Sequence, residues 1–353
     1  MSTKVNSARS LRKTLVLLAA SCISLAGASA ASANIIIETV PVGNPGNAPD
    51  PLTGYGEVNY TYFIGKYDVT AGQYTAFLNA VAGVDTYDLY NSDMAGGGSS
   101  GEYGCGISRT GDGTVGDPYT YTVAAGFVNR PVTRVDFWDA CRFANWMDNG
   151  QPTGAEGPGT TETGAYTLTT TAISENTVTR NSGALWAVSS EDEWYKAAYY
   201  NPATSTYYLY PTSSDTPPGN NLADPLPGNN ANFHTSTSPR PIDGGYYTTP
   251  VGQFINSPSP YGTYDQGGNV WNWNESIIDE SDRGLRGGSM YYGVSDLVSS
   301  YRAGFSPADD INGHAVGFRV VYLAPVPEPA SLALLAVGGL GLAIRRRRGG
   351  ITK

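Results

Sequence analysis

The sequence predicts an α+β fold of few short helices and strands joined by long loops. Only 15% of its 353 residues are charged, whereas glycine (44), proline (23) and tyrosine (25) are abundant. This composition is unlike that of coiled coils or helical repeats. Three short helix signals are separated by stretches rich in Gly, Ser, Thr and Asn. We find neither an internal repeat nor the even strand spacing of a β-sandwich.

The first 33 residues have the pattern of a secretory signal peptide. Basic residues come first, the apolar run 15–20 follows, and small residues continue to Ala33. This order predicts export and cleavage after Ala30 or Ala33. Residues 1–33 are therefore assigned to the leader and residues 34–326 to one folded domain.

The end of the chain, residues 327–353, has the features of a sorting tail. Pro327, Glu328 and Pro329 precede an apolar stretch at 330–344 and an arginine cluster at 345–348. The apolar stretch is shorter than the roughly 20 residues of a stable membrane-spanning helix, so a weak transmembrane anchor is the alternative interpretation. The three features in this order resemble the PEP-CTERM sorting signal of exopolysaccharide-producing Gram-negative bacteria. That resemblance implies transient membrane contact, processing by an exosortase-type enzyme, and display at the cell surface or in the extracellular matrix.

The body of the chain is strongly acidic. Residues 34–326 hold 12 Lys or Arg against 30 Asp or Glu, a net charge of −18. This charge would repel phosphates, so nucleic acid is excluded as a partner. It suits solubility outside the cell and the binding of divalent cations.

Local signals place three helices and one strand. Thr70 and Gln73 form a capping-box pattern ahead of apolar residues with helical spacing up to Val81. Asp136 can cap a second helix, which Asn149-Gly150 would end and whose inner face would hold Phe137, Cys141, Ala144 and Met147. A third helix is expected from Ser190 to Tyr199, and a strand over 35–40. We expect the polar stretches 96–101, 153–164 and 212–230 to be surface loops.

A series of short motifs runs through the domain. They are Tyr62–Thr70 (YFIGKYDVT), Arg130–Val132 (RPV), Trp138–Ala140 (WDA), Phe143–Trp146 (FANW), Ser190–Trp194 (SEDEW), Gly267–Trp273 (GGNVWNW), Arg286–Ser289 (RGGS) and Gly317–Arg319 (GFR). In this order they resemble the formylglycine-generating enzyme (sulfatase-modifying factor) domain, from about Glu38 to Val321. The resemblance implies an irregular mixed fold related to C-type lectins.

One glycine-rich acidic segment has the character of a calcium site. Calcium takes roughly six to eight oxygen ligands, and adjacent glycines allow backbone carbonyls to converge. By the resemblance, a first structural calcium site maps onto the Asp265 side chain, the Gly268 and Val270 carbonyls, and the Asn272 side chain.

The resemblance also implies a second calcium site in another loop. It maps onto the Asn232 side chain, the Phe233 carbonyl, the Asp243 side chain and the Gly245 carbonyl. Neither ion would be catalytic. Calcium would tie together loops that lack a core of their own.

The motifs predict that the chemistry of this family is missing. Formylglycine-generating enzymes oxidise a substrate cysteine with oxygen, using two copper-binding cysteines after the Gly-Gly-Ser motif. The matching positions here hold Tyr292 and Leu297, and no cysteine follows Cys141. A phenol and an alkyl group cannot supply the soft thiolates that Cu(I) requires. Copper is therefore not expected, and no catalytic residue is assigned.

Other side chains are assigned structural roles. Cys141 is expected to be a buried thiol, and export permits a disulfide between Cys105 and Cys141. His234 and His314 are too few for a three-histidine iron site. The acids at 191–193 suit the first turn of a helix.

Two arginines and a group of aromatic residues have an alternative functional interpretation. Arg286 and Arg319 are expected to bond carbonyls and acids inside the domain, although a binding groove is the other possibility. The aromatic group could form a platform for a sugar or peptide; its members are Trp271, Trp273, Tyr291, Tyr292 and Tyr301.

We therefore expect an exported, non-catalytic module that is braced by calcium and binds a glycan or protein ligand. The alternative is a formylglycine-generating oxidase acting on sulfatase cysteines. An enzyme of other chemistry in the same groove is a third possibility.

Overall fold

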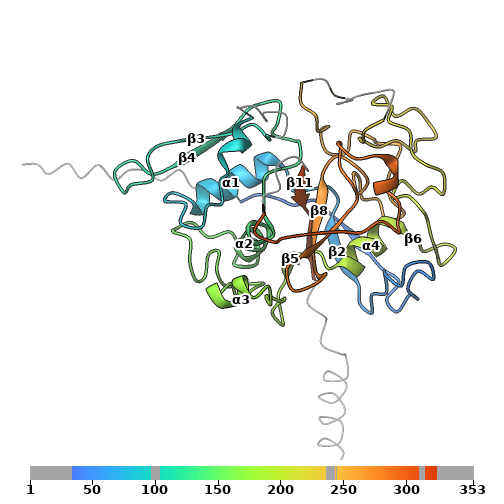
Figure 1. Cartoon of the computed structure of the whole chain (residues 1–353), viewed down its shortest axis with the longest axis horizontal. Helices are drawn as coiled ribbons and strands as arrows, with labels where there is room; N and C mark the ends of the chain where they lie inside the picture. The colour runs from blue at the N-terminus through green and yellow to red at the C-terminus, as the bar shows by residue number, and fades with distance from the viewer. Residues whose placement is uncertain (1–33, 97–103, 236–242, 244, 310–314, 324–353) are drawn as a thin grey trace, which may run out of the picture. The chain divides into compact units, whose positions relative to one another are not determined.

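The computed structural model describes residues 34–96, 104–235, 243, 245–309 and 315–323 (Figure 1). The expected signal peptide, the sorting motif Pro327–Pro329 and the apolar stretch after it lie outside these residues. Within the described residues, no helix is long and apolar enough to span a bilayer.

The first sheet joins distant parts of the domain. Its antiparallel strands follow the order β1-β2-β12-β5, with bounds Thr39–Val42, Tyr62–Gly65, Val320–Tyr322 and Trp186–Val188. Ile64 lies opposite Val40 on one side and Val321 on the other. The last described strand is therefore fixed beside the first two.

The second sheet carries the motifs of the C-terminal half. Its strand order is β10-β9-β8-β11, with bounds Ala303–Phe305, Arg283–Arg286, Trp271–Ile277 and Val316–Phe318. Strand β11 runs parallel to β8, with Val316 opposite Trp271, and the other pairs are antiparallel. Arg319 alone separates β11 from β12, so one residue links the two sheets.

Short ribbons and helices complete the described structure. The ribbons are β3 (Ile107–Thr110) with β4 (Thr120–Val123) and β6 (Tyr200–Asn201) with β7 (Thr206–Tyr207). The helices are α1 (Ala71–Val81), α2 (Phe137–Asp148), α3 (Thr170–Ser174) and α4 (Glu191–Tyr199), with 3-10 turns η1 (Ser92–Ala95) and η3 (Val294–Asp296). Few helices and several small sheets make an α+β fold, as the sequence predicts.

The helix caps confirm the three helices expected from sequence. Thr70, Asp136 and Ser190 each accept a hydrogen bond from the backbone N–H three residues on, and the side chain of that residue returns the bond. Such reciprocal caps satisfy backbone donors that a helix start otherwise leaves unpaired. Helix α3 was not predicted. None of its five residues is buried, so its sequence has no apolar pattern with helical spacing.

Aromatic packing between α1, α2 and β11 forms the centre of the core. The ring of Phe143 lies 5.4 Å from Phe77 and 5.3 Å from Phe318 (centroid to centroid), both edge-to-face. Trp146 lies 5.3 Å from Phe77. The expected inner face of α2 is confirmed, since Phe137, Cys141, Ala144 and Met147 are buried.

Two predictions about chain segments need correction. The expected strand over 35–40 begins only at Thr39, and residues 35–38 instead line a cavity. The polar stretches 153–164 and 212–230 are not simple surface loops, because Thr161 and Asp224 are almost fully buried, whereas the stretch 96–101 lies outside the described residues from residue 97 on. Asp224 stays satisfied by accepting hydrogen bonds from Asn230, Ser257 and Asn256, so hydrogen bonds hold these loops where apolar contacts are scarce.

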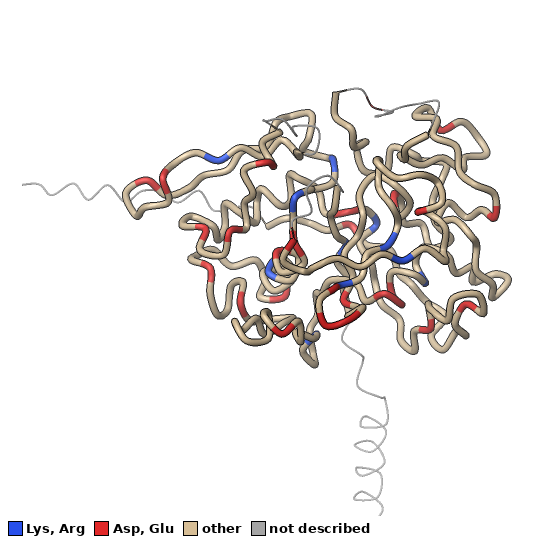
Figure 2. The backbone as a smooth tube through the Cα atoms, viewed as in Figure 1, with Lys and Arg blue, Asp and Glu red and all other residues tan. Residues whose placement is uncertain are grey.

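Many of the positive charges lie inside the domain. Figure 2 shows most Lys and Arg toward the interior and many Asp and Glu on the outlying loops. Arg283, Arg286 and Arg319 are among the largest fully buried side chains. Buried guanidinium groups need acids or carbonyls as partners, and these partners determine the geometry of the candidate site.

Candidate functional site

The loop after β9 holds Tyr292 and Leu297, the two positions that match the copper-binding cysteines of the family it resembles. Leu297 is fully buried against Tyr210, Ala231 and Phe233. Tyr292 is half-buried, and its ring packs edge-to-face on Trp271 with centroids 5.4 Å apart. A phenol and an isobutyl group therefore occupy packed positions in this loop.

Two glycines bring this loop close to its neighbours. Gly287 and Gly288 have φ values of +97° and +73°, in a region that side chains other than glycine rarely adopt. A Cβ atom at Gly287 would lie 2.6 Å from the Gln266 carbonyl oxygen, and one at Gly288 would lie 2.8 Å from Leu297 Cδ1. The Gly-Gly-Ser motif thus serves close packing here.

The two remaining thiols lie elsewhere in the domain. Cys141 is fully buried on α2, and Cys105 is buried next to the Thr133 carbonyl, with Sγ 3.6 Å from that oxygen. Both are free thiols, so the permitted disulfide is not formed. Burial raises the pKa of Cys105 to about 11 and that of Cys141 well above its ordinary value. Protonated thiols are poor nucleophiles and poor metal ligands.

A buried acid on α4 organises the next part of the site. Glu191 is paired with Arg286 and Arg302, each with an N–O distance of 2.7 Å. Burial alone would raise the pKa of Glu191, but the hydrogen bond from Arg302 and the charge of Arg286 lower it. Glu193 is likewise fully buried and paired with Arg180. The expected place of these acids in the first turn of a helix is confirmed, and the structure adds that Glu191 and Glu193 are buried and paired with arginines.

A second buried ion pair connects the two sheets to the start of α1. Arg319 Nη2 lies 3.0 Å from Asp68 Oδ1, and its Nη1 donates to the Gly65 carbonyl. Arg286 similarly donates to the Ser299 and Tyr301 carbonyls. The structural interpretation of both arginines is therefore confirmed.

The first calcium set is occupied by hydrogen bonds of its own. Asn272 Oδ1 accepts from Trp194 Nε1 (2.9 Å) and Arg319 Nε (3.1 Å), and Asn272 Nδ2 donates to Asp68 Oδ1 (3.0 Å). Asp265 Oδ2 accepts from the Gly252 N–H (2.6 Å). The Val270 carbonyl accepts a longer bond from Asn272 Nδ2, and the Gly268 N–H donates to Gly287. A calcium ion bound by Asn272 would have to replace two of these bonds.

The second calcium set lies around a more exposed carboxylate. Asp243 has a side chain 23% exposed, and its Oδ2 lies 2.6 Å from Arg130 Nη2. Asn232 donates from Nδ2 to the Tyr247 carbonyl, and the Phe233 carbonyl accepts from Asn220. Gly245 follows, with a φ of +95°. In this set, Arg130 is paired with only one of the two carboxylate oxygens of Asp243.

The expected aromatic platform is only partly available. Trp271 and Trp273 are almost fully buried, and Trp273 Nε1 donates to the Val135 carbonyl, so neither ring can stack on a ligand. Tyr301 is 38% exposed, and Tyr291 and Tyr292 are half-buried. Any surface for a ligand here is therefore formed by tyrosines.

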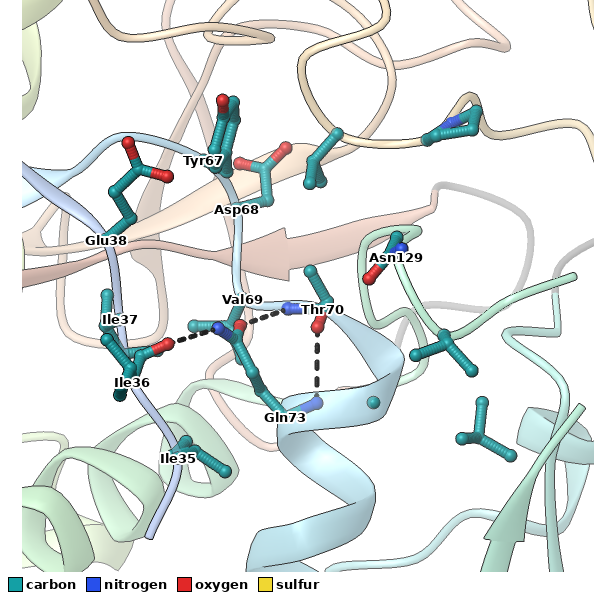
Figure 3. Close-up of a pocket in the computed structure, with 15 residues that line it drawn as sticks. Ile35, Ile36, Ile37, Glu38, Tyr67, Asp68, Val69, Thr70, Gln73 and Asn129 are labelled. Carbon is teal, nitrogen blue, oxygen red and sulfur yellow. Dashed lines mark hydrogen bonds between the residues drawn. The ribbon is translucent and has the colours of Figure 1, made fainter. Parts of the chain in front are cut away.

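Sequence reasoning missed one candidate residue, Asp68. It lies within the motif Tyr62–Thr70 and is the only acid in that motif. Figure 3 shows it in the lining of the cavity that residues 35–38 also line. Burial raises the pKa of Asp68 to about 7 against the lowering effect of Arg319. Its position two residues ahead of the helix cap Thr70 is the sequence signal that indicates it.

The fold and this loop define the class of the protein: an irregular α+β domain stabilised by buried arginine–acid pairs. The model of the sulfatase-modifying factor enzyme 1-like domain matches residues 51–324, and the chain belongs to that family. The PEP-CTERM protein-sorting motif matches residues 325–348. This motif marks export and cell-surface association in Gram-negative bacteria and implies sorting by an exosortase.

Several solved structures are similar to the chain at low identity. CarF shares 20% identity over 82% of this chain and 99% of its own, with a TM-score of 0.49. Variable protein 1 of Treponema denticola shares 16% (80% and 94% covered, TM-score 0.45), and PvdO from Pseudomonas aeruginosa shares 18% (81% and 90% covered, TM-score 0.40). Comparison with curated proteins gave no match.

Proposed function

We propose that this chain is an exported, surface- or matrix-associated member of the family that lacks the oxidase chemistry and acts as a binding module. The observation that carries the proposal is the pair of residues at the expected copper positions. Tyr292 packs on Trp271, and Leu297 packs in an apolar cluster. Neither side chain can form the bis-thiolate site on which the family's oxidation depends.

The remaining thiols support the same conclusion. Cys105 and Cys141 are buried, and the pKa of each is raised by burial. A Cu(I) site needs thiolates that face one another. Cys105 donates to a backbone carbonyl, and Cys141 belongs to the inner face of α2.

A role in binding is supported by the surface near this loop. Tyr291 packs against Tyr247, and Tyr301 packs against Trp271, with ring centroids 6.2 Å and 5.8 Å apart. Tyrosines held in place by neighbouring rings offer apolar faces and hydroxyl groups to a ligand at low entropic cost. A glycan or a protein fits this chemistry, and the export signal gives such a module access to both.

Calcium is the structural cofactor in this proposal. The set of Asn232, Phe233, Asp243 and Gly245 suits the ion better than the set around Asn272, whose carboxamide oxygen already accepts two hydrogen bonds. Calcium requires a hard oxygen donor set with charge, which the Asp243 carboxylate supplies. The ion would tie the 232–233 segment to the 243–245 segment.

Oxygen consumption tests the proposal against the oxidase alternative. The exported chain is loaded with Cu(I) and given a peptide containing the cysteine motif of sulfatases, and oxygen uptake and aldehyde formation are followed. We expect neither above the copper-only control. Aldehyde formation that depends on the protein would overturn the proposal in favour of a formylglycine-generating oxidase.

A further inference from the structure

One tripeptide between β1 and β2 has the spacing of an N-glycosylation acceptor. Asn59, Tyr60 and Thr61 form the pattern Asn-x-Thr, in which the middle residue is not proline. An asparagine in this pattern can carry a glycan where it lies on the surface of an exported protein. The sorting motif at 325–348 marks export, so access to the acceptor side chains decides whether the pattern can be used.

The two side chains that the transfer reaction requires are accessible. Asn59 and Thr61 are both exposed, and neither side chain is hydrogen-bonded to another described residue. Tyr60 between them is 43% exposed, and its hydroxyl donates to Glu193 Oε1 at 2.8 Å. The structure therefore holds the middle of the tripeptide and leaves the acceptor amide and the hydroxyl two residues later free for an enzyme.

The backbone of the tripeptide can adapt to an enzyme without loss of secondary structure. Among the described residues, no backbone hydrogen bond involves residues 59–61. The chain is fixed on both sides, because the Val58 carbonyl accepts from the Gly46 N–H (2.9 Å) and Tyr62 begins β2. A short segment with solvated backbone between two fixed ends is the kind of site at which local opening costs little free energy.

The sequence contains one further tripeptide of this pattern, and the structure excludes it. Asn274, Glu275 and Ser276 lie in β8, and Asn274 is completely buried. Its Oδ1 accepts the Ser276 N–H at 3.1 Å. An enzyme cannot reach this amide in the folded domain. The two tripeptides therefore differ in burial, which makes Asn274 an internal control for Asn59.

A polar cavity lies directly beside the acceptor amide. It has a volume of about 350 Å³ and is lined by residues 44–48, Tyr200 and Ser205. A Cβ atom placed on Gly46 would lie 3.9 Å from Asn59 Oδ1, so the amide borders this cavity. Asn44 and Ser205 are exposed and offer an amide and a hydroxyl to the hydroxyl groups of a sugar, while Tyr200 adds an aromatic residue to the wall.

We propose that Asn59 is the acceptor of an N-linked oligosaccharide whose first sugar lies over this cavity. The donor is an oligosaccharide joined to a polyprenyl diphosphate. Asn59 Nδ2 forms a bond to C1 of the first sugar while the bond from C1 to the diphosphate oxygen breaks. The polyprenyl diphosphate leaves with the electron pair, and a base of the transferring enzyme takes the amide proton. Glu57, which is exposed two residues ahead of Asn59, offers a carboxylate with which a basic group of that enzyme can pair.

The test uses the full chain, exported by bacteria that contain an oligosaccharyltransferase and its polyprenyl-diphosphate-linked oligosaccharide. Mass spectrometry of the intact protein and of its peptides locates the glycan. We expect one glycan per chain, on Asn59, and an unmodified Asn274. An unmodified Asn59 in cells that glycosylate a known acceptor protein would overturn the proposal, and so would a glycan confined to other residues.

Two matched variants test the role of the hydroxyl group. Thr61→Val keeps the size of the side chain without its hydroxyl and should abolish glycosylation of Asn59, whereas Thr61→Ser keeps the hydroxyl and should be glycosylated as the wild type is. Unfolding curves show that both variants are folded. Undiminished glycosylation of Thr61→Val would show that the Asn-x-Thr pattern is not what the enzyme recognises, and would overturn the proposal.

NMR of the glycosylated chain tests the place of the first sugar. We expect contacts between its ring protons and Ser205 or Tyr200, and a sugar without such contacts would overturn its placement over the cavity. The inference goes beyond the proposed binding function and requires only export. Glycosylation together with oxidase activity would overturn only the proposed loss of chemistry, whereas absence of both would overturn only the glycan site.

Discussion

Arg319 Nη2 and Asp68 Oδ1 lie 3.0 Å apart with both side chains fully buried, which fixes the residue between the two sheets to the residues ahead of α1. Arg319→Met should therefore lower the free energy of unfolding by about 3 kcal/mol, because it leaves a buried carboxylate without its charge partner. Equilibrium unfolding in urea at neutral pH measures the loss.

The matched control for this prediction is an exposed ion pair. Lys66 and Glu38 lie 2.7 Å apart with side chains 26% and 60% exposed, so Lys66→Met should cost less than about 1 kcal/mol. Similar losses in the two variants would contradict the importance assigned to burial of the Arg319 pair.

Thiol reactivity provides a second prediction. Cys105 and Cys141 are buried free thiols whose pKa is raised by burial, so neither should react with a thiol reagent in the folded chain at neutral pH. Both should react once the chain is unfolded. Rapid labelling of either thiol in the folded protein, followed by mass spectrometry, would show an accessible thiolate that this structure does not provide.

The pH dependence of stability should carry a contribution from Asp265. Burial raises the pKa of Asp265 to about 6, above its value of about 4 in an unfolded chain. The folded state therefore holds this proton more tightly. The contribution is fully present below about pH 4 and is lost as pH rises through about 6, a change of about 3 kcal/mol.

Asp265→Asn isolates this contribution. Asn tolerates the left-handed backbone of this position, where φ is +60°, and its carboxamide oxygen can still accept the Gly252 N–H. Between about pH 4 and about pH 7, the free energy of unfolding of the wild type should fall relative to that of the variant. A difference that stays constant over this range would show that Asp265 titrates normally.

Calcium removal tests the proposed brace. Chelation should lower the melting temperature of the exported chain, and added calcium should restore it. Asp243→Asn should remove this response, because it takes away the charged ligand of the second set, whereas Asp265→Asn should keep it. If the melting temperature of the wild type does not respond to calcium, the proposal that calcium stabilises the domain is wrong.

Local signals explain which parts of the fold could be predicted from the sequence. The caps at Thr70 and Ser190 depend on residues three positions apart, so the helices they start were correctly predicted. The first-turn position of Glu191 was correctly predicted, but its ion pairs were not, because its partners, Arg286 and Arg302, are far away in the sequence. The cavity beside Asp68 was missed for the same reason, since its walls come from four separated segments.

The proposed absence of a copper site is tested most directly by a competitive Cu(I) titration under anaerobic conditions. The wild type is compared with a variant carrying both Tyr292→Cys and Leu297→Cys, which restores the two thiols at the matching positions. We predict no high-affinity Cu(I) binding by the wild type and a gain of one Cu(I) per chain in the double variant. Stoichiometric, high-affinity binding by the wild type would contradict the account.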